Sequence, residues 1–170
     1  MAESQESACP GCGLRLPVKK SASSHRYINA SPECWDLFTE VLATEYSNAS
    51  LFQQIHELTV DGYAVQHPGG KHPDKSMGIH LCGLHLMLER NIPSSKIPPL
   101  HQRLGNSVGT WPHFPPPPDL GSVTVFDVAL AGSVEEHAEK VWLWARAVWQ
   151  TWARHHDAVA DLVARHLGVD

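Results

Sequence analysis

Apolar residues recur at helical spacing along most of the chain, and the first clear run is "SPECWDLFTEVLATEY". Ser31 can cap a helix there, Pro32 suits its first position, and Glu33 complements its positive end. An apolar stripe follows at Trp35, Phe38, Val41 and Leu42. The pattern predicts a helix that begins after Ser31 and ends before the polar break "SNAS" at 47–50.

Three more long segments carry a helical pattern. The first runs from about Leu51 to Gln66 and ends at the Pro- and Gly-containing stretch "HPGGKHPD". The second runs from about Lys75 to Arg90 and is apolar on most sides, which predicts a central helix. The third is one long helix from Val134 to about Leu167. Shorter helices are expected near 98–104 and in "TVFDVALAG" at 124–132.

Residues 91–121 are rich in proline, and the "PPPP" run at 115–118 predicts a polyproline-like segment. Trp111 and Phe114 flank the run and favour burial, so we interpret it as a strap packed across the surface. The alternative is a ligand for an aromatic groove. Without an alternating strand pattern or an internal repeat, the predicted fold class is all-α. We expect an irregular helical bundle with a zinc-stapled N-terminal knuckle and a Pro-rich strap.

A length of 170 residues with 42% hydrophobic residues is enough for one domain with its own core. We expect residues 1–8 to be a flexible N-terminus and residues 9–170 to form a single helical domain. Within that domain, 9–34 is the zinc knuckle segment and 31–167 carries the helices.

Charge and hydropathy limit the partners. The net charge is −5 and no basic tract is present, which argues against nucleic acid. No window approaches the roughly 18 apolar residues of a membrane span, and residues 1–8 have no apolar leader core. We therefore expect a cytoplasmic protein, in which four cysteines are metal ligands or free thiols. The sequence does not identify a protein partner.

The segment "CPGCG" is typical of a zinc knuckle, because its turn places the sulfurs of Cys9 and Cys12 on one ion. A redox pair would need this motif at a helix start within a βαβ unit, and no such unit is predicted. Two thiols remain. Cys34 lies in the first turn of a predicted helix, where the helix dipole favours a thiolate, whereas Cys82 lies in an apolar helix, where a free thiol packs as a small apolar side chain.

Cys34 is the better ligand of the two, and His25 lies in the irregular segment between Cys12 and Cys34. The predicted ligands of one structural zinc ion are therefore Cys9, Cys12, His25 and Cys34. Four protein ligands close a tetrahedral site. If His25 were not a ligand, a three-cysteine site could instead hold water and act as a Lewis acid.

Several of these segments resemble a bacterial family catalogued only as a domain of unknown function. The similar segments are "CPGCGL", "HRYINASPECW", "ELTVDGYAVQHPG", "IHLCGLHLMLER" and "LGSVTVFDVALA", and they extend from Cys9 to about His156. The resemblance groups these segments together and implies no activity.

A second polar cluster is expected between the helices. His56, Tyr63 and His67 share one helical stripe, Asp61 lies beside it, and His80 faces the core from the next helix. We predict that Asp61, Tyr63, His67 and His80 form a pocket for a small polar molecule or a second metal. A hydrogen bond from His67 or His80 to Asp61 would raise the basicity of the imidazole and make the pair a candidate general base. The alternative is a set of hydrogen-bonded core histidines.

Two functional classes follow. The protein is either a small-molecule enzyme or binder that works in the pocket of histidine, aspartate and tyrosine, or a non-catalytic zinc-stabilised interaction module. We favour the first class, because buried titratable groups are costly to keep. The sequence names neither substrate nor reaction.

Overall fold

A computed structural model describes residues 5–169 and confirms the all-α class. Two short strands precede seven α-helices, and two 3-10 turns, η1 (Ser94–Lys96) and η2 (Ala153–His155), join some of them. The elements are β1 (Glu6–Ala8), β2 (Arg15–Pro17), α1 (Pro32–Tyr46), α2 (Ala49–Gln66), α3 (Asp74–Leu88), α4 (Ile97–Ser107), α5 (Val125–Ala129), α6 (Val134–Thr151) and α7 (His156–Leu167).

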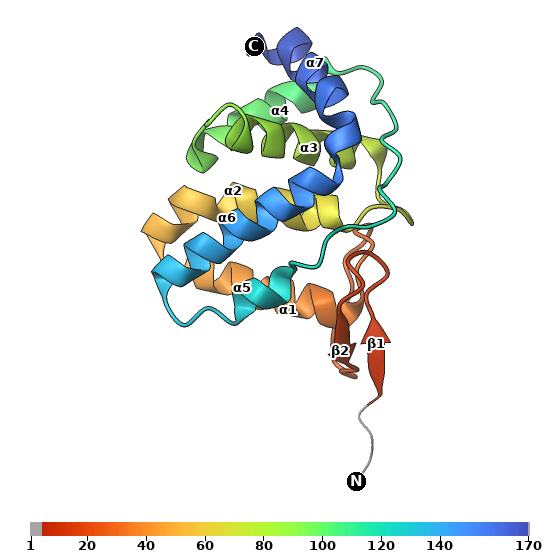
Figure 1. Cartoon of the computed structure of the whole chain (residues 1–170), viewed down its shortest axis with the longest axis vertical. Helices are drawn as coiled ribbons and strands as arrows, with labels where there is room; N and C mark the ends of the chain where they lie inside the picture. Colours follow the sequence, from red (N-terminus) through yellow and green to blue (C-terminus); the bar gives the residue numbers. More distant parts are fainter. Residues whose placement is uncertain (1–4, 170) are drawn as a thin grey trace.

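Helices α2 and α6 cross the middle of the molecule, with α1 and α5 on one side and α3, α4 and α7 on the other (Figure 1). The largest fully buried side chains include Trp144, Trp149 and Trp152. Cys82 in α3 belongs to the same apolar core and is fully buried, as its position in an apolar helix predicts. In residues 5–169, no helix combines the length and the apolar character that crossing a lipid bilayer requires.

Helix α1 begins where the sequence predicts, whereas α2 begins at Ala49, two residues before its predicted start near Leu51. Ser31 accepts a hydrogen bond from the Cys34 amide at 3.2 Å, so it caps α1. Asn48 caps α2 in the same way through the Leu51 amide. Because only the short break at 47–48 separates them, α1 and α2 form an antiparallel pair. The start of α1 therefore lies beside the end of α2.

The single long helix predicted over 134–167 is instead two helices that differ in direction (Figure 1). The break is the 3-10 turn η2, where the His155 amide donates to the Trp152 carbonyl. Arg154 leaves the helical path and donates to the carbonyls of Pro115 and Pro116. The Pro-rich strap is thereby tied to the junction of α6 and α7, and Phe114 is buried beneath it.

The expected flexible segment 1–8 is described in part. Residues 1–4 lie outside the described residues, while Glu6–Ala8 form β1 and pair antiparallel with β2. These strands were not predicted, because three residues are too few for an alternating pattern to show. The loop between them is the "CPGC" knuckle, so the hairpin carries two of the four predicted metal ligands, Cys9 and Cys12.

Candidate metal centre

The knuckle is a tight loop between β1 and β2. The Cys9 amide donates to the Leu14 carbonyl at 2.8 Å, and the Gly13 amide donates to the Cys9 carbonyl at 2.9 Å. Gly13 has a φ of 75°, a conformation that glycine adopts without strain. The loop turns the sulfurs of Cys9 and Cys12 towards the helices.

Gly11 lets this loop lie directly against the end of α2. A Cβ at this position would be 2.5 Å from Cδ2 of His67 and 2.6 Å from the Asn29 carbonyl oxygen. Both distances are shorter than a carbon atom tolerates, and one of the two partners is backbone. The glycine of the "CPGC" motif is therefore a packing requirement for bringing the loop and His67 together.

Cys34 is the third residue of α1, where the amide groups of the first turn favour a thiolate. Its sulfur is fully buried and accepts a hydrogen bond from the Tyr63 hydroxyl at 3.4 Å. The Ser31 amide donates to the sulfur of Cys9 at 3.4 Å. These donors stabilise negative charge on the two sulfurs.

His67 follows the last residue of α2 and is fully buried. Its Nδ1 lies 2.6 Å from the Tyr63 carbonyl oxygen, which can only accept a hydrogen bond, so Nδ1 carries the proton. The lone pair of the neutral ring is then on Nε2, which lies 3.4 Å from the sulfur of Cys34. A backbone partner on one nitrogen that leaves the other free is the usual arrangement of a metal-bound histidine.

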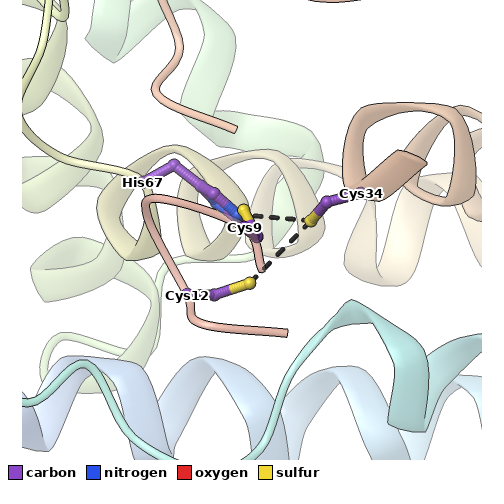
Figure 2. Close-up of side chains that lie close together, drawn as sticks. All are labelled: Cys9, Cys12, Cys34 and His67. Atoms are coloured by element: carbon purple, nitrogen blue, oxygen red, sulfur yellow. Dashed lines mark hydrogen bonds between the residues drawn. The ribbon is translucent and has the colours of Figure 1, made fainter. Parts of the chain in front are cut away.

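Figure 2 shows the three sulfurs and Nε2 of His67 converging on one point. The four ligand atoms lie within 4.8 Å of one another. The sulfurs of Cys12 and Cys34 are 3.8 Å apart, far beyond a disulfide bond and equal to the spacing of about 3.8 Å that tetrahedral Zn–S bonds of about 2.3 Å require. The cluster of Cys9, Cys12, Cys34 and His67 could therefore hold a metal ion.

Without a cation, the cluster must share protons. Hydrogen bonds from Cys12 and Cys34 lower the pKa of Cys9, and the contacts with Cys12 and Cys9 raise the pKa of Cys34. Burial alone would lower the pKa of His67, but contacts with Cys12 and Cys9 raise it to about 9. A divalent cation removes this competition, because it favours thiolate and neutral imidazole together.

The structure places His67, and not the predicted His25, beside the three cysteines. Nδ1 of His25 accepts hydrogen bonds from the amides of Tyr27 and Ile28, and its ring packs 4.6 Å from that of Trp35. It therefore closes its own turn and is not part of the cluster. Proximity in sequence suggested His25, whereas the antiparallel pairing of α1 with α2 supplies His67.

The predicted pocket of Asp61, Tyr63, His67 and His80 is also corrected, because these residues belong to two separate groups. Tyr63 and His67 lie at the cysteine cluster, whereas Asp61 pairs with His80. Positions 61 and 63 point to nearly opposite sides of a helix with 3.6 residues per turn. Asp61 therefore faces α3 and α4, while Tyr63 faces α1 and the knuckle.

A second group of potential ligands surrounds Asp61. Its Oδ1 lies 2.7 Å from Nδ1 of His80, and its Oδ2 lies 3.3 Å from Nε2 of His101. Oε2 of Glu57 lies 3.8 Å from the other nitrogen of His101. Ligand atoms of Glu57, Asp61 and His101 lie within 4.8 Å of one another. Glu57 and His101 were not among the predicted site residues, although Glu57 and Asp61 lie four residues apart and therefore on one side of a helix.

The charges in this group depend on one another. Burial would raise the pKa of Asp61, but His101 and His80 outweigh it and hold this pKa below its usual value. Burial and the Asp61 charge both raise the pKa of Glu57. Burial would lower the pKa of His101, but Asp61 and Glu57 raise it.

A third buried carboxylate, Glu45, has a complete set of partners. Its Oε2 lies 2.7 Å from Nδ1 of His56, and its Oε1 accepts from the Thr59 hydroxyl at 2.6 Å and contacts Nε2 of His137 at 3.2 Å. Burial would raise the pKa of Glu45, but the bonds from His137, His56 and Thr59 lower it. This network ties α1, α2 and α6 together and needs no further ligand.

Comparison with known proteins gives a family and no activity. Residues 7–153 match the model of a family described as "Family of unknown function (DUF5946)". No curated protein and no solved structure matches the chain. The matched range includes all the residues of the cysteine cluster and of the group around Asp61.

Proposed function

Since the chain belongs to the family of unknown function DUF5946, whose description carries no activity, we propose a function from the site itself. Cys9, Cys12, Cys34 and His67 bind one zinc ion, and this ion fastens the N-terminal hairpin to the helical bundle. The proposal rests on the convergence of three sulfurs and Nε2 of His67 from three distant segments, with Nδ1 of His67 turned to the Tyr63 carbonyl.

The donor set favours zinc. Thiolate and imidazole are the ligands of structural zinc sites, whereas magnesium and calcium prefer oxygen ligands. The spacing of 3.8 Å between the sulfurs of Cys12 and Cys34 already fits a tetrahedral ion. Ion binding therefore requires little movement of the described side chains.

The role of the ion follows from its position. Cys9 and Cys12 come from the hairpin, Cys34 from the first turn of α1, and His67 from the end of α2. Cys9, Cys34 and His67 are at most 3% exposed. Four protein ligands and this burial leave no coordination position for a substrate, so the ion stabilises structure.

Zinc content tests the proposal. We expect one zinc per chain in protein purified without a His tag, and a loss of that zinc in Cys12→Ser and in His67→Gln. Limited proteolysis should then cleave residues 9–30 in these variants, while circular dichroism shows the helices retained. The helices persist because the apolar core extends well beyond Cys9 and Cys34 and is continuous without the ion.

Two matched controls isolate the site. His25→Gln changes the histidine nearest in sequence, and Cys82→Ala removes a buried thiol that lies outside the cluster. Both should keep one zinc per chain. Full zinc in Cys12→Ser, or zinc loss in His25→Gln with retention in His67→Gln, would contradict the proposed ligand set.

The expectation of a small-molecule enzyme or binder stays a proposal, and one specific observation favours it. The group of Glu57, Asp61 and His101 contains a buried carboxylate oxygen with no hydrogen-bond partner among residues 5–169. If that group binds neither metal nor ligand, the alternative of a non-catalytic, zinc-stabilised interaction module takes its place.

A further inference from the structure

We propose that Glu57, Asp61 and His101 form a second metal site, which takes a divalent first-row transition ion and leaves coordination positions open. The proposal does not depend on the cysteine cluster, because the two groups share no residue. Its ligands come from the middle of α2 and from α4.

The first support is a pair of buried polar atoms without partners. Oδ2 of Asp61 and Nε2 of His101 make no hydrogen bond within residues 5–169, although they lie 3.3 Å apart. Asp61 is fully buried. A buried polar atom without a partner costs free energy, and a metal ion provides one partner for both atoms.

The second support is the spacing of these atoms. Two ligands on one ion at about 2.0–2.2 Å are separated by about 2.9–3.6 Å in octahedral or tetrahedral geometry. The distance of 3.3 Å between Oδ2 and Nε2 lies within this range. Glu57 is one helical turn before Asp61, and its carboxylate is within 4.8 Å of both ligand atoms.

His80 positions the Asp61 carboxylate. Its Nδ1 lies 2.7 Å from Oδ1 of Asp61, which directs Oδ2 towards His101. Outer-sphere partners of this kind fix the orientation of a ligand and tune its affinity. His80 is therefore a positioning residue, and it also lines a surface hollow of about 340 Å³ beside Tyr27 and Lys75.

Gly83 of α3 provides the space for the site. A Cβ at this position would overlap the Asp61 carboxylate and would lie 2.5 Å from Nε2 of His101. α3 therefore approaches α2 at the one residue type that leaves room for these two groups. Any larger side chain would displace the carboxylate or the imidazole.

The Glu45 network shows that the arrangement at Asp61 is not a general property of buried carboxylates in this fold. Each oxygen of Glu45 has a hydrogen-bond partner, so that group is complete. At Asp61 only Oδ1 has one. The difference marks Oδ2 as the atom that is free to bind an ion.

The geometry also leaves an approach from solvent. The side chains of Glu57, His80 and His101 are 20%, 18% and 15% exposed. Two carboxylates and one imidazole are suitable for manganese, iron or zinc, and they occupy only three positions. Water or a substrate oxygen can take the others, which is the arrangement of a metal that activates its ligands.

Titration with Mn²⁺ tests the proposal in the full chain, with the cysteine cluster kept at one zinc. Mn²⁺ prefers oxygen and nitrogen ligands, so it does not compete for the thiolates. We expect the electron paramagnetic resonance signal of free Mn²⁺ to fall until one equivalent is bound. Nuclear magnetic resonance signals of His80 and His101 should broaden, while that of His25 persists.

Three variants locate the bound ion. Glu57→Gln and His101→Gln remove ligands, and His80→Gln removes the positioning residue, which should weaken Mn²⁺ binding by about 10- to 100-fold. Asp74→Asn is the matched control, because Asp74 also pairs with a histidine, His113, at 2.7 Å but on the exposed surface. It should bind Mn²⁺ like the wild type.

Each outcome decides the proposal. Since Glu57 and His101 are partly exposed, their variants are expected to fold, and circular dichroism checks this. An undiminished free Mn²⁺ signal in the wild type overturns the site. So does equal binding by wild type and Glu57→Gln, or equal weakening by Asp74→Asn. Zinc content of the cysteine cluster is measured separately, so the two sites succeed or fail independently.

Discussion

Helix α2 carries two polar groups that differ in almost every property. At its C-terminal end, His67 joins three cysteines in a buried cluster whose ligand atoms come from three segments (Figure 2). One to three turns earlier, Glu57 and Asp61 join His101 in a group of oxygen and nitrogen atoms that is partly exposed. The first group has three thiols and one imidazole, and the second has two carboxylates and one imidazole.

The number of ligands in each group determines what a bound ion can do there. Four ligands saturate a tetrahedral ion, so the cysteine cluster can stabilise the fold but offers no position to a substrate. Three ligands leave an ion reactive, and the lack of a hydrogen bond to Oδ2 of Asp61 is a cost that binding would remove. A structural metal site at the cysteine cluster and a reactive metal site at Asp61 can thus use different faces of one helix.

The largest expected effect comes from removing zinc. Treating the reduced wild-type protein with a strong chelator should lower the free energy of unfolding by about 5 kcal/mol, because zinc binding contributes directly to folding. The melting temperature should then fall by about 10–20 °C. Differential scanning calorimetry measures both. Removing Mn²⁺ from the group around Asp61 should lower the melting temperature far less than removing zinc does. Equal changes in melting temperature would contradict the proposed difference between the two sites.

Glu45→Gln should have the next largest effect. The change removes the charge that holds His56, Thr59 and His137 together, and breaking a buried charged network costs about 3 kcal/mol or more. Asp61→Asn should cost less, about 1–2 kcal/mol, because the amide oxygen can keep the bond to His80 and only the 3.3 Å ion pair with His101 is lost. Urea unfolding of both variants compares them. A larger cost for Asp61→Asn would mean that Asp61 serves stability.

Two glycine variants should each affect only one of the two groups, with an intermediate loss in the free energy of unfolding. Gly11→Ala places a Cβ against His67, and Gly83→Ala places one against Asp61 and His101. Each should destabilise the fold by about 1–3 kcal/mol through overpacking. Gly11→Ala should weaken zinc binding only, and Gly83→Ala should weaken Mn²⁺ binding only.

Gly109→Ala is the control for this pair, because a Cβ there meets nothing within 4 Å among the described residues. It should change neither metal affinity. If Gly11→Ala weakened Mn²⁺ binding as much as zinc binding, the two groups would not be independent.

The smallest effect concerns one thiol. Burial and the Asp61 charge raise the pKa of Cys82 to about 12, so this thiol should stay unreactive in the native protein. In the zinc-loaded protein, a thiol reagent should label none of the four cysteines quickly. After chelation it should label Cys9, Cys12 and Cys34, as mass spectrometry of the digested protein would show. Rapid labelling of Cys82 in either state would mean that α3 opens.

The sequence predicts the helices well and the site only in part. Ser31, Pro32 and the apolar stripe after them define α1 locally, and the "CPGC" spacing marks Cys9 and Cys12 as a pair of ligands. Cys34 follows from its place at a helix start. The structure brings these three cysteines together, and each prediction depends on residues close together in the chain.

The remaining ligands depend on packing. His67 reaches the cluster because α1 and α2 are antiparallel, and His101 reaches Asp61 because α4 packs on α3 across Gly83. The break between α6 and α7 is likewise set by a distant segment, through the bonds from Arg154 to Pro115 and Pro116. The helical pattern continues through this break and gives no local sign of it.

The most direct test of the central claim is X-ray absorption spectroscopy at the zinc edge of the untagged protein with one zinc per chain. We expect the zinc ion to have three sulfur ligands at about 2.3 Å and one nitrogen ligand at about 2.0 Å. His67→Gln should lose the zinc and with it the signal at the zinc edge, and His25→Gln should leave the spectrum unchanged. A first shell of oxygen and nitrogen without sulfur, or a nitrogen shell that disappears in His25→Gln, would contradict the assignment of Cys9, Cys12, Cys34 and His67.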